Sequence, residues 1–347
     1  MPELPEVESA RRLVEKHLLN IPIKSVILRE QGGGPRDGLI DDIIMPLPDA
    51  EDNWVSTLVG KTIIAARRKG KQLFFEVGGS SGSSKSGGKS RKKDLNSSTP
   101  TGQLHLLFHF GMTGSFAIEG MEVGTYKSFK VDPIYPPRFT KFEVVFENGQ
   151  KLSFADPRRL GRIKLLSGNP LEQPPLNKLA IDPLVEKVDK SYFIDRVKSS
   201  KGDIKTALLN QEAIIAGIGN YLADEVCYQS KISPKSMCSS LPDDKIAELL
   251  TVINDVLSVA CDHNERNVEF PEHWLFHQRW SKGKGGVKMP SGASVAFDNV
   301  GGRTTAIVAA VQIMYSKTSD AGKKRKVAKG DDVEKKIGGV KRKAAGK

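Results

Sequence analysis

The first six residues, MPELPE, place an amine beside two carboxylic acids. If the initiator methionine is removed, Pro2 carries a free secondary amine, and amines attack electrophilic sugar or carbonyl carbons to form Schiff bases. Such an amine titrates at about 7.7–8.0 in peptides, so a usable fraction is unprotonated at neutral pH. Glu3 and Glu6 could supply the acid, base and electrostatic groups that glycosidic cleavage requires. Taken alone, the stretch favours the ordinary alternative, a terminal proline followed by glutamates that cap a helix.

A second candidate is the stretch KTALLNQEAIIAGIGNYLADEVCYQSKISP over residues 205–234. Its pattern predicts helices over 205–212 and 221–228, joined by a turn that contains Gly217-Ile218-Gly219. The start of the second helix offers unpaired N–H groups and a positive dipole end, which favour a phosphate. A dinucleotide site is not predicted, because Leu222 stands where a third glycine is needed and no strand precedes the motif. The pair fits either a clamp on a DNA backbone or an ordinary helical core.

Two glycine-containing loops, HFGMTG at 109–114 and DPRRLG at 156–161, each follow a predicted strand. Met112 and Arg158 on neighbouring loops could wedge into a base stack and fill the space that a flipped nucleotide leaves. The alternative is a core methionine and an arginine pair on the surface.

A metal site is not predicted. His273 and His277 have helical spacing, with Cys261 and His263 upstream. However, no cysteine follows Cys261 and no Cys-x-x-Cys pair occurs, which argues against structural zinc.

The elements that would position these groups form an α+β pattern. Apolar residues on one face predict a helix over 5–20. Short runs rich in β-forming residues then predict strands over 26–28, 62–66, 73–77, 104–110, 115–118, 142–146 and 152–154. Asn148-Gly149 between the last two is typical of a hairpin turn. The first half is therefore expected to be a helix plus an antiparallel β-sandwich or barrel.

The second half has a different pattern. Prolines crowd residues 170–183, which predicts an interdomain linker. Helical periodicity follows from Ser191 and is clearest over 246–260. A strand-turn-strand pattern around Gly301-Gly302 ends the ordered part of the chain. We expect a helical domain followed by a β-hairpin.

The composition narrows the class of protein. The 347 residues include 53 Lys and Arg against 41 Asp and Glu, a net charge of +12. The mean hydropathy of −0.34 and the lack of a run of roughly 18 apolar residues argue against an integral membrane protein. An acidic start without an apolar core is not a secretory signal, and three cysteines make no disulfide framework. A strongly basic chain favours nucleic acid as the partner.

The excess charge lies in two segments. Residues 78–103 are Gly/Ser/Lys-rich with five basic residues against one acidic, and residues 316–347 hold twelve against four. Together they account for the whole +12, so the rest of the chain is neutral. Both segments are predicted to be disordered. The clusters KKRKV at 323–327 and KRK at 341–343 are typical of nuclear-localisation signals, or of a merely solvated tail.

Taken together, MPELPEVES, ARRKGKQLFFEV, HFGMTGSF, DPRRLGR, GIGNYLADEV and GGRTT occur in an order that closely resembles the formamidopyrimidine-DNA glycosylase and endonuclease VIII family. The resemblance runs from Met1 to about Tyr315, is broken by 78–103 and is faint over 31–56. It implies a bifunctional glycosylase and abasic-site lyase of base-excision repair. Such an enzyme removes oxidised purines through a Schiff base and cleaves the strand by β,δ-elimination. It needs no cofactor.

The resemblance also implies roles for single residues. Pro2 is similar to the nucleophile, Glu3 to the acid/base and Glu6 to a supporting carboxylate in the lesion pocket. Lys71 matches a lysine that contacts the lesion and its phosphate, with Lys69 the weaker match because the stretch has one extra residue. The implied phosphate ligands are His109, Lys205, Asn220 and Arg303. The implied void-filling residues are Met112, Arg158 and Leu160, where bacterial members usually have phenylalanine at the last position.

Two departures from the family pattern have consequences. The four-cysteine zinc finger is absent while GGRTT at 301–305 is present, which resembles the zincless finger of plant and fungal members. The stretch 267–283 is shorter than the bacterial loop that covers a flipped 8-oxoguanine. We therefore expect better activity on ring-opened formamidopyrimidines and abasic sites than on 8-oxoguanine.

The expected domains follow from the same reading: a catalytic β-sandwich over 1–168, a linker over 169–186, a helix-two-turn-helix domain over 187–270, a zincless hairpin over 271–315 and the basic tail. The expected partner is double-stranded DNA with damaged bases or abasic sites, bound by a monomer in the nucleus. A non-catalytic DNA or chromatin-binding protein on this fold is the main alternative, and intact Pro2, Glu3 and Lys71 weigh against it. A general RNA-binding protein lacks support because no aromatic-rich platform is visible.

Overall fold

The computed structural model describes residues 2–45, 50–79, 103–122, 124 and 126–316. The basic tail from 317 onward and most of the predicted insertion, residues 80–102, lie outside this range.

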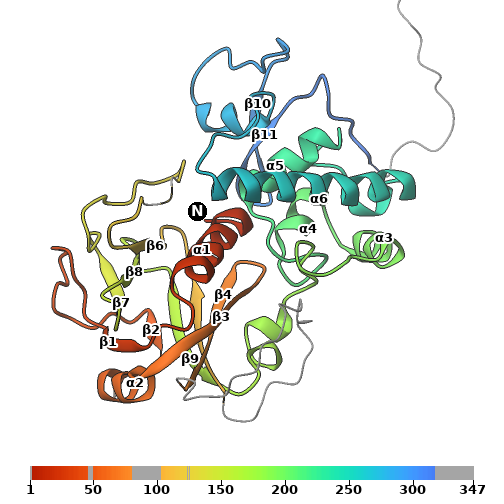
Figure 1. The fold of residues 1–347 in the computed structure, drawn as a ribbon. Helices are drawn as coiled ribbons and strands as arrows, with labels where there is room; N and C mark the ends of the chain where they lie inside the picture. Colours follow the sequence, from red (N-terminus) through yellow and green to blue (C-terminus); the bar gives the residue numbers. More distant parts are fainter. Residues whose placement is uncertain (1, 46–49, 80–102, 123, 125, 317–347) are drawn as a thin grey trace, which may run out of the picture. The chain divides into compact units, whose positions relative to one another are not determined.

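The first helix, α1 (Leu4–His17), forms where the sequence predicts it. A proline in its first turn removes an N–H that has no helical partner, and Glu6 lies at the positive end of the helix. Its apolar face, which includes Val7 and Val14, is fully buried. The helix packs against both strand β3 (Lys61–Lys69) and the long helix α6 (Asp243–Glu265), as Figure 1 shows. It therefore belongs to the packing of both halves of the described chain.

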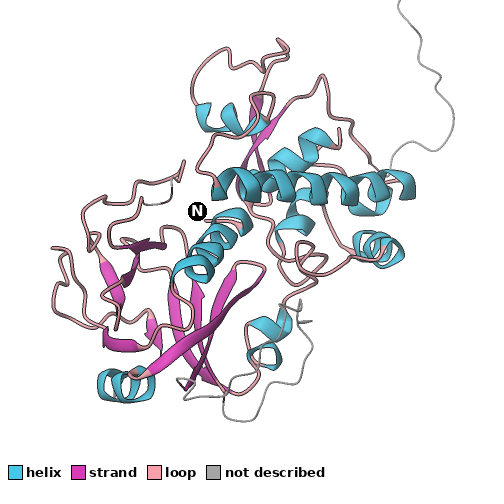
Figure 2. Cartoon of the chain, viewed as in Figure 1, coloured by secondary structure: helices cyan, strands magenta, loops and turns pink. Residues whose placement is uncertain are grey.

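Two sheets face each other in the first half (Figure 2). The four-stranded sheet has the order β1 (Ile23–Ile27), β7 (Thr140–Phe146), β8 (Lys151–Ala155) and β6 (Ser115–Ile118). The five-stranded sheet has the order β2 (Ile44–Met45), β9 (Arg162–Ser167), β5 (Leu104–His109), β4 (Gln72–Gly79) and β3. A phenylalanine cluster fills the space between them: Phe75, Phe108, Phe116, Phe142 and Phe154. The predicted β-sandwich is confirmed.

Three elements of this half were not predicted. Helix α2 (Ala50–Leu58) and strands β2 and β9 add to the helix and strands that the sequence pattern indicates. The pair β2–β9 is parallel, so the sheet is not purely antiparallel as expected. Strand β3 also runs on to Lys69, because Arg67 and Arg68 pair with Phe74 and Leu73 of β4.

The proline-rich segment packs more tightly than a linker pattern indicates. It forms two short 3-10 turns, η1 (Pro170–Glu172) and η2 (Leu176–Lys178). Leu176 is fully buried against Phe74 and Leu107 of the five-stranded sheet. The segment thus covers the outer face of that sheet.

The second half is helical, as predicted. Its helices are α3 (Lys190–Ser199), α4 (Ile204–Leu209), α5 (Asn220–Gln229) and α6. Asp189 and Asp203 cap α3 and α4 by accepting hydrogen bonds from N–H groups of their first turns. The amphipathic helix α6 buries its apolar face in a second core with α5. None of the helices in the described ranges is both long and apolar enough to cross a membrane.

The predicted C-terminal hairpin is also present. Strands β10 (Ala296–Val300) and β11 (Arg303–Ile307) join through Gly301 and Gly302, both with positive φ. A side chain on Gly301 would come within 2.3 Å of Thr206 Oγ1, so the tip lies directly against α4. Within the residues that the structure describes, no group of three or more His, Cys, Asp and Glu could hold a metal ion.

A buried ion-pair network joins α1, β3 and the proline-rich segment. Arg68 is 2% exposed; its Nε donates to Glu8 Oε2 at 3.0 Å, and its guanidinium pairs with Asp182. Asp182 Oδ2 also accepts the Gly70 N–H at 2.6 Å, and the Gly70 carbonyl accepts from Arg68 at 2.7 Å. The network therefore fixes the turn between β3 and β4.

We predict that Asp182→Ala lowers the free energy of unfolding by about 3–5 kcal/mol, because it leaves the Arg68 guanidinium buried without its main partner. Urea denaturation measures the change. The matched control is Asp195→Ala on the exposed side of α3, with an expected change of less than about 0.5 kcal/mol. Equal losses in the two variants would contradict the structural role of the network.

Candidate active site

The side chain of Glu3 closes the start of helix α5. Its Oε1 accepts the Tyr221 N–H at 2.9 Å and its Oε2 accepts the Leu222 N–H at 3.1 Å. A Cβ on Gly219 would come within 2.1 Å of the Glu3 carboxyl carbon, so the turn before α5 needs glycine at this position. Pro2, which precedes Glu3, is buried. The GIGNY motif and the N-terminal motif, which are far apart in sequence, therefore form one site.

Lys71 is the cation of this site. It lies in the turn between β3 and β4, and its Nζ donates to the Ile218 carbonyl at 2.9 Å. Burial lowers the pKa of Lys71, and the charge of Arg303 lowers it further, while the charges of Glu3 and Glu6 act in the opposite direction. The charges of Glu3, Glu6 and Arg303 thus all act on Lys71.

The pKa values of both glutamates, Glu3 and Glu6, are raised, with different contributions from their neighbours. Burial raises the pKa of Glu3 above its ordinary value, against the opposing effects of Lys71 and the two α5 N–H groups. Burial, with the neighbouring Glu3 charge, raises the pKa of Glu6 to about 7. Of these groups, Glu6 has a pKa that suits it to exchange protons near neutral pH.

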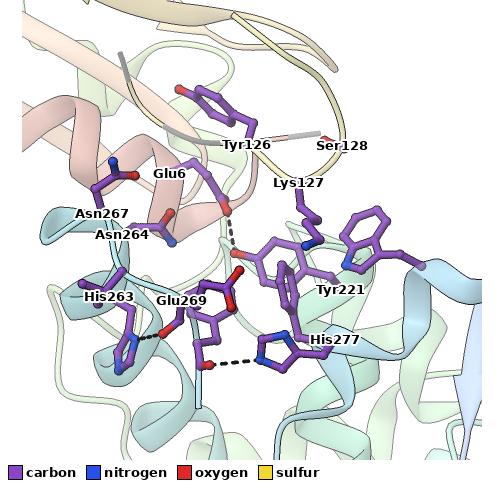
Figure 3. A pocket seen from close by; sticks show the side chains of 14 residues that line it. Glu6, Tyr126, Lys127, Ser128, Tyr221, His263, Asn264, Asn267, Glu269 and His277 are labelled. Carbon is purple, nitrogen blue, oxygen red and sulfur yellow. Dashed lines mark hydrogen bonds between the residues drawn. The ribbon is translucent and has the colours of Figure 1, made fainter. Parts of the chain in front are cut away.

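Glu6 lies between this site and an open pocket (Figure 3). Its Oε2 accepts the Glu3 N–H and its Oε1 accepts the Tyr221 hydroxyl, both at 2.8 Å. The pocket contains about 820 Å³, including space open to solvent. Its aromatic wall is made by Tyr126, Tyr221, Phe270, Phe276 and Trp280. The flat aromatic walls suit a planar ring that carries polar groups.

Of the histidines considered as metal ligands in the sequence, His263 and His277 line the pocket, whereas His273 is exposed to solvent. The ring nitrogens contact backbone carbonyls, His263 Nδ1 at 2.5 Å from Glu269 O and His277 Nε2 at 3.0 Å from Phe270 O. Both rings therefore fix the 269–277 backbone beside the pocket.

Three of the predicted phosphate ligands are at least partly exposed to solvent: Arg303, Asn220 and His109. Arg303 is exposed at the tip of the hairpin, and Asn220 Nδ2 donates to the Thr304 carbonyl at 3.1 Å. His109 is half-buried at the end of β5, where burial and the charges of Lys71 and Arg162 lower its pKa.

The position of Lys205 differs from the one expected of a phosphate ligand. Its side chain is fully buried and its Nζ donates to Asp224 Oδ1 at 2.6 Å and to Thr305 Oγ1 at 2.7 Å. A cation whose donors are used inside the protein is not placed to bind a phosphate at the surface. In this structure Lys205 instead ties β11 to α4 and α5, and so supports Arg303.

The two glycine-containing loops meet, as predicted. A Cβ on Gly111 would lie 2.4 Å from the Leu160 carbonyl carbon, so the loops are in direct contact. Leu160 is 43% exposed, Arg158 is exposed and Met112 is half-buried. All three positions border the contact between the loops.

Sequence reasoning missed the residue that shapes these loops. Asp156 is fully buried; it accepts the Thr113 hydroxyl at 2.6 Å and the N–H groups of Leu160 and Gly161 at 2.9 and 2.7 Å. An aspartate before proline is typical of a turn in which the side chain accepts backbone N–H groups, so a signal was present. Tyr221 was missed because it occupies an apolar helical position.

Comparisons with known proteins agree with this geometry. The family model described as the formamidopyrimidine-DNA glycosylase N-terminal domain matches residues 1–163, and that of the formamidopyrimidine-DNA glycosylase H2TH domain matches residues 179–272. The formamidopyrimidine-DNA glycosylase of Arabidopsis thaliana is 35% identical over 331 residues, which cover 95% of this chain and 75% of the relative. That of Corynebacterium glutamicum strain R is 32% identical over 269 residues, 75% of this chain and 78% of the relative.

Solved structures show the same likeness. A complex of Lactococcus lactis Fpg with abasic-site DNA superposes with a TM-score of 0.65 at 25% identity, covering 90% of this chain and 100% of that one. A mutant of the Lactococcus lactis protein with Fapy-dG DNA gives 0.65 at 26% identity, with 90% and 99% coverage. The chain therefore belongs to the formamidopyrimidine-DNA glycosylase family, whose enzymes combine DNA glycosylase and abasic-site lyase activities.

Proposed function

We propose that this chain excises oxidised purines from double-stranded DNA and cleaves the resulting abasic site, with the Pro2 amine as nucleophile. The observation that carries the proposal is the anchoring of the N-terminus. Glu3 is bonded to α5, and Lys71 lies beside both glutamates. An amine next to a buried acid and a lysine is the set that Schiff-base chemistry needs.

The proposed reaction proceeds in three stages: base displacement, ring opening and two eliminations. The Pro2 nitrogen forms a bond to C1′ as the bond from C1′ to the base breaks, and the leaving base takes a proton. Ring opening, with O4′ taking up a proton, then gives a positively charged iminium ion between the Pro2 nitrogen and C1′. Loss of a C2′ proton expels the 3′ phosphate, and a second elimination expels the 5′ phosphate. Glu3 is the proposed carrier of the protons, because it is the acid nearest to Pro2 in sequence and its pKa is raised by burial.

DNA binding is proposed to use exposed and half-buried groups around this site. Arg303, Asn220 and His109 would contact phosphates, while Lys205 holds the hairpin in place. Met112, Arg158 and Leu160 would fill the space left by the flipped nucleotide, which offsets an unstacking cost of a few kcal/mol. The hairpin β10–β11 would act as the zincless finger of this chain. The proposed working form is a monomer in the nucleus.

The damaged base is proposed to enter the pocket beside Glu6. The segment 267–283 forms one aromatic wall of this pocket with Phe270, Phe276 and Trp280. Aromatic faces bind a planar ring without reading its polar edge. This supports the expectation that 8-oxoguanine, which differs from guanine by small changes at that edge, is the poorer substrate.

We predict that borohydride traps a covalent adduct between the chain and an abasic-site duplex. Two extra residues before Pro2 should reduce trapping by more than about a thousand-fold, because they move the amine away from Glu3. Intact mass establishes that the initiator methionine is absent from the tested chain. The control carries the same two residues at its C-terminus and should trap normally.

No adduct with the unmodified chain would overturn the catalytic proposal and leave a DNA-binding protein on this fold. An undiminished adduct with the extended N-terminus would assign the chemistry to another amine, with Lys71 the first candidate.

We predict that a formamidopyrimidine opposite cytosine is excised about ten-fold faster than 8-oxoguanine opposite cytosine in single turnovers at saturating enzyme. A tenfold rate ratio requires only about 1.4 kcal/mol of difference in transition-state binding. Cleavage of an abasic site in the same duplex sequence controls for enzyme activity. Equal rates on the two lesions would show that this pocket does read the edge of 8-oxoguanine.

We predict that removal of residues 317–347 flattens the salt dependence of DNA binding and leaves single-turnover excision at saturation nearly unchanged. Lysine-rich chains bind DNA by releasing counterions, so the logarithmic slope should decrease by several units. Filter binding between 50 and 200 mM salt, about the range where this effect is large, measures the slope. A tail of equal length with glutamine at its basic positions is the control and should match the deletion. Loss of excision itself would contradict this division of roles.

A further inference from the structure

Tyr221 contacts both carboxylates of the site. Its backbone N–H donates to Glu3 Oε1 at 2.9 Å, and its hydroxyl donates to Glu6 Oε1 at 2.8 Å. The residue lies in the first turn of α5 and is 4% exposed. Through Tyr221, Glu6 is therefore hydrogen-bonded to the start of helix α5, the same helix end that Glu3 caps.

Two phenylalanine rings hold the ring of Tyr221. Phe276 packs edge-on against it with ring centroids 5.2 Å apart, and Phe270 lies tilted at 6.2 Å. These contacts restrict the ring, so the direction of its hydroxyl group is set before DNA binds. Figure 3 shows the hydroxyl group of Tyr221 directed at Glu6 at the edge of the pocket.

The Glu6 carboxyl group is held by donors on two sides. The Glu3 N–H binds Oε2 from α1, and the Tyr221 hydroxyl binds Oε1 from α5. These two hydrogen bonds fix the orientation of the Glu6 carboxyl group. Each damaged base that enters the pocket would therefore meet the same edge of this group.

We propose that Tyr221 is a positioning residue for base excision: its hydroxyl group fixes the Glu6 carboxyl group toward the pocket that receives the damaged base. The inference rests on the proposed function. It separates the two reactions of the enzyme, because an abasic site has no base to fill the pocket. Tyr221 should therefore matter for excision and be nearly dispensable for cleavage of an abasic site.

The first test is Tyr221→Phe, which keeps the ring and its packing. We expect single-turnover excision of a formamidopyrimidine to fall about ten-fold, the effect of losing one hydrogen bond to a charged group. Cleavage of an abasic site should change by less than about two-fold. Tyr192→Phe on α3, which removes a tyrosine hydroxyl away from the pocket, is the matched control and should leave both rates unchanged.

The second test is a double-mutant cycle with Glu6→Gln. If Tyr221 acts through Glu6, adding Tyr221→Phe to Glu6→Gln should reduce excision by less than about two-fold beyond the single Glu6 variant. A full ten-fold further loss would show that Tyr221 acts independently of Glu6 and would overturn the proposal.

The pH profile gives a readout that packing alone would not move. The Tyr221 hydrogen bond lowers the pKa of Glu6, so its loss must raise that pKa. The limb of the excision profile that Glu6 controls should move to higher pH by about one unit in Tyr221→Phe. The other titratable groups that face Glu6 or line its pocket are unchanged in the variant: Glu3, Lys71, Tyr126, Lys127, Cys261, His263, Glu269 and His277.

The outcomes are distinct. Equal losses of excision and abasic-site cleavage in Tyr221→Phe, or no loss of either, would overturn the positioning role. A wild-type chain that forms no borohydride adduct would overturn the proposed function itself, whatever the Tyr221 variant does.

Discussion

The hydrogen bonds from the Tyr221 and Leu222 N–H groups to the Glu3 carboxylate join the two halves of the described chain at the site. A buried carboxylate is costly unless donors surround it, and the start of a helix supplies free N–H groups and a favourable dipole. The requirement for glycine at 219, where a Cβ would overlap the carboxyl group, follows from this contact. The position of the N-terminal amine depends on it as well, because Pro2 is bonded directly to Glu3.

Lys71 approaches the same point from the sheet, and its position depends on a second set of buried charges. Asp182 binds both Arg68 and the Gly70 N–H, so the proline-rich segment holds the turn that carries Lys71. Asp224 has the same function for the hairpin, since it binds Lys205, Arg279 and the Ala306 N–H. The turn that carries Lys71 and the hairpin that carries Arg303 are thus each held by a buried carboxylate.

Much of the fold could be predicted because apolar spacing records it, as the apolar face of α1 and that of α6 show. Strand β9 was missed because it has only three apolar residues, which Lys164 interrupts, and polar residues at both ends, Arg162 and Ser167. The motifs indicated the residues of the site, but the amino-acid sequence does not show which charged side chains contact one another. Lys205 reads as a DNA ligand until the fold brings Asp224 to it, and Tyr221 reads as a core residue until its hydroxyl group meets Glu6.

Strand β4 separates the site from the lysine-rich insertion. Its first residue, Gln72, adjoins Lys71, whereas Gly79 at its other end leads into the segment that returns to the sheet at Leu104. The seven steps from Gln72 to Gly79 span about 23 Å. A fluorophore, purification handle or surface tether attached directly after Gly79 would therefore be anchored to the chain a full strand length from Lys71. Under the proposed role of Pro2, such a handle at the N-terminus, the usual place, would instead block the amine that attacks the sugar.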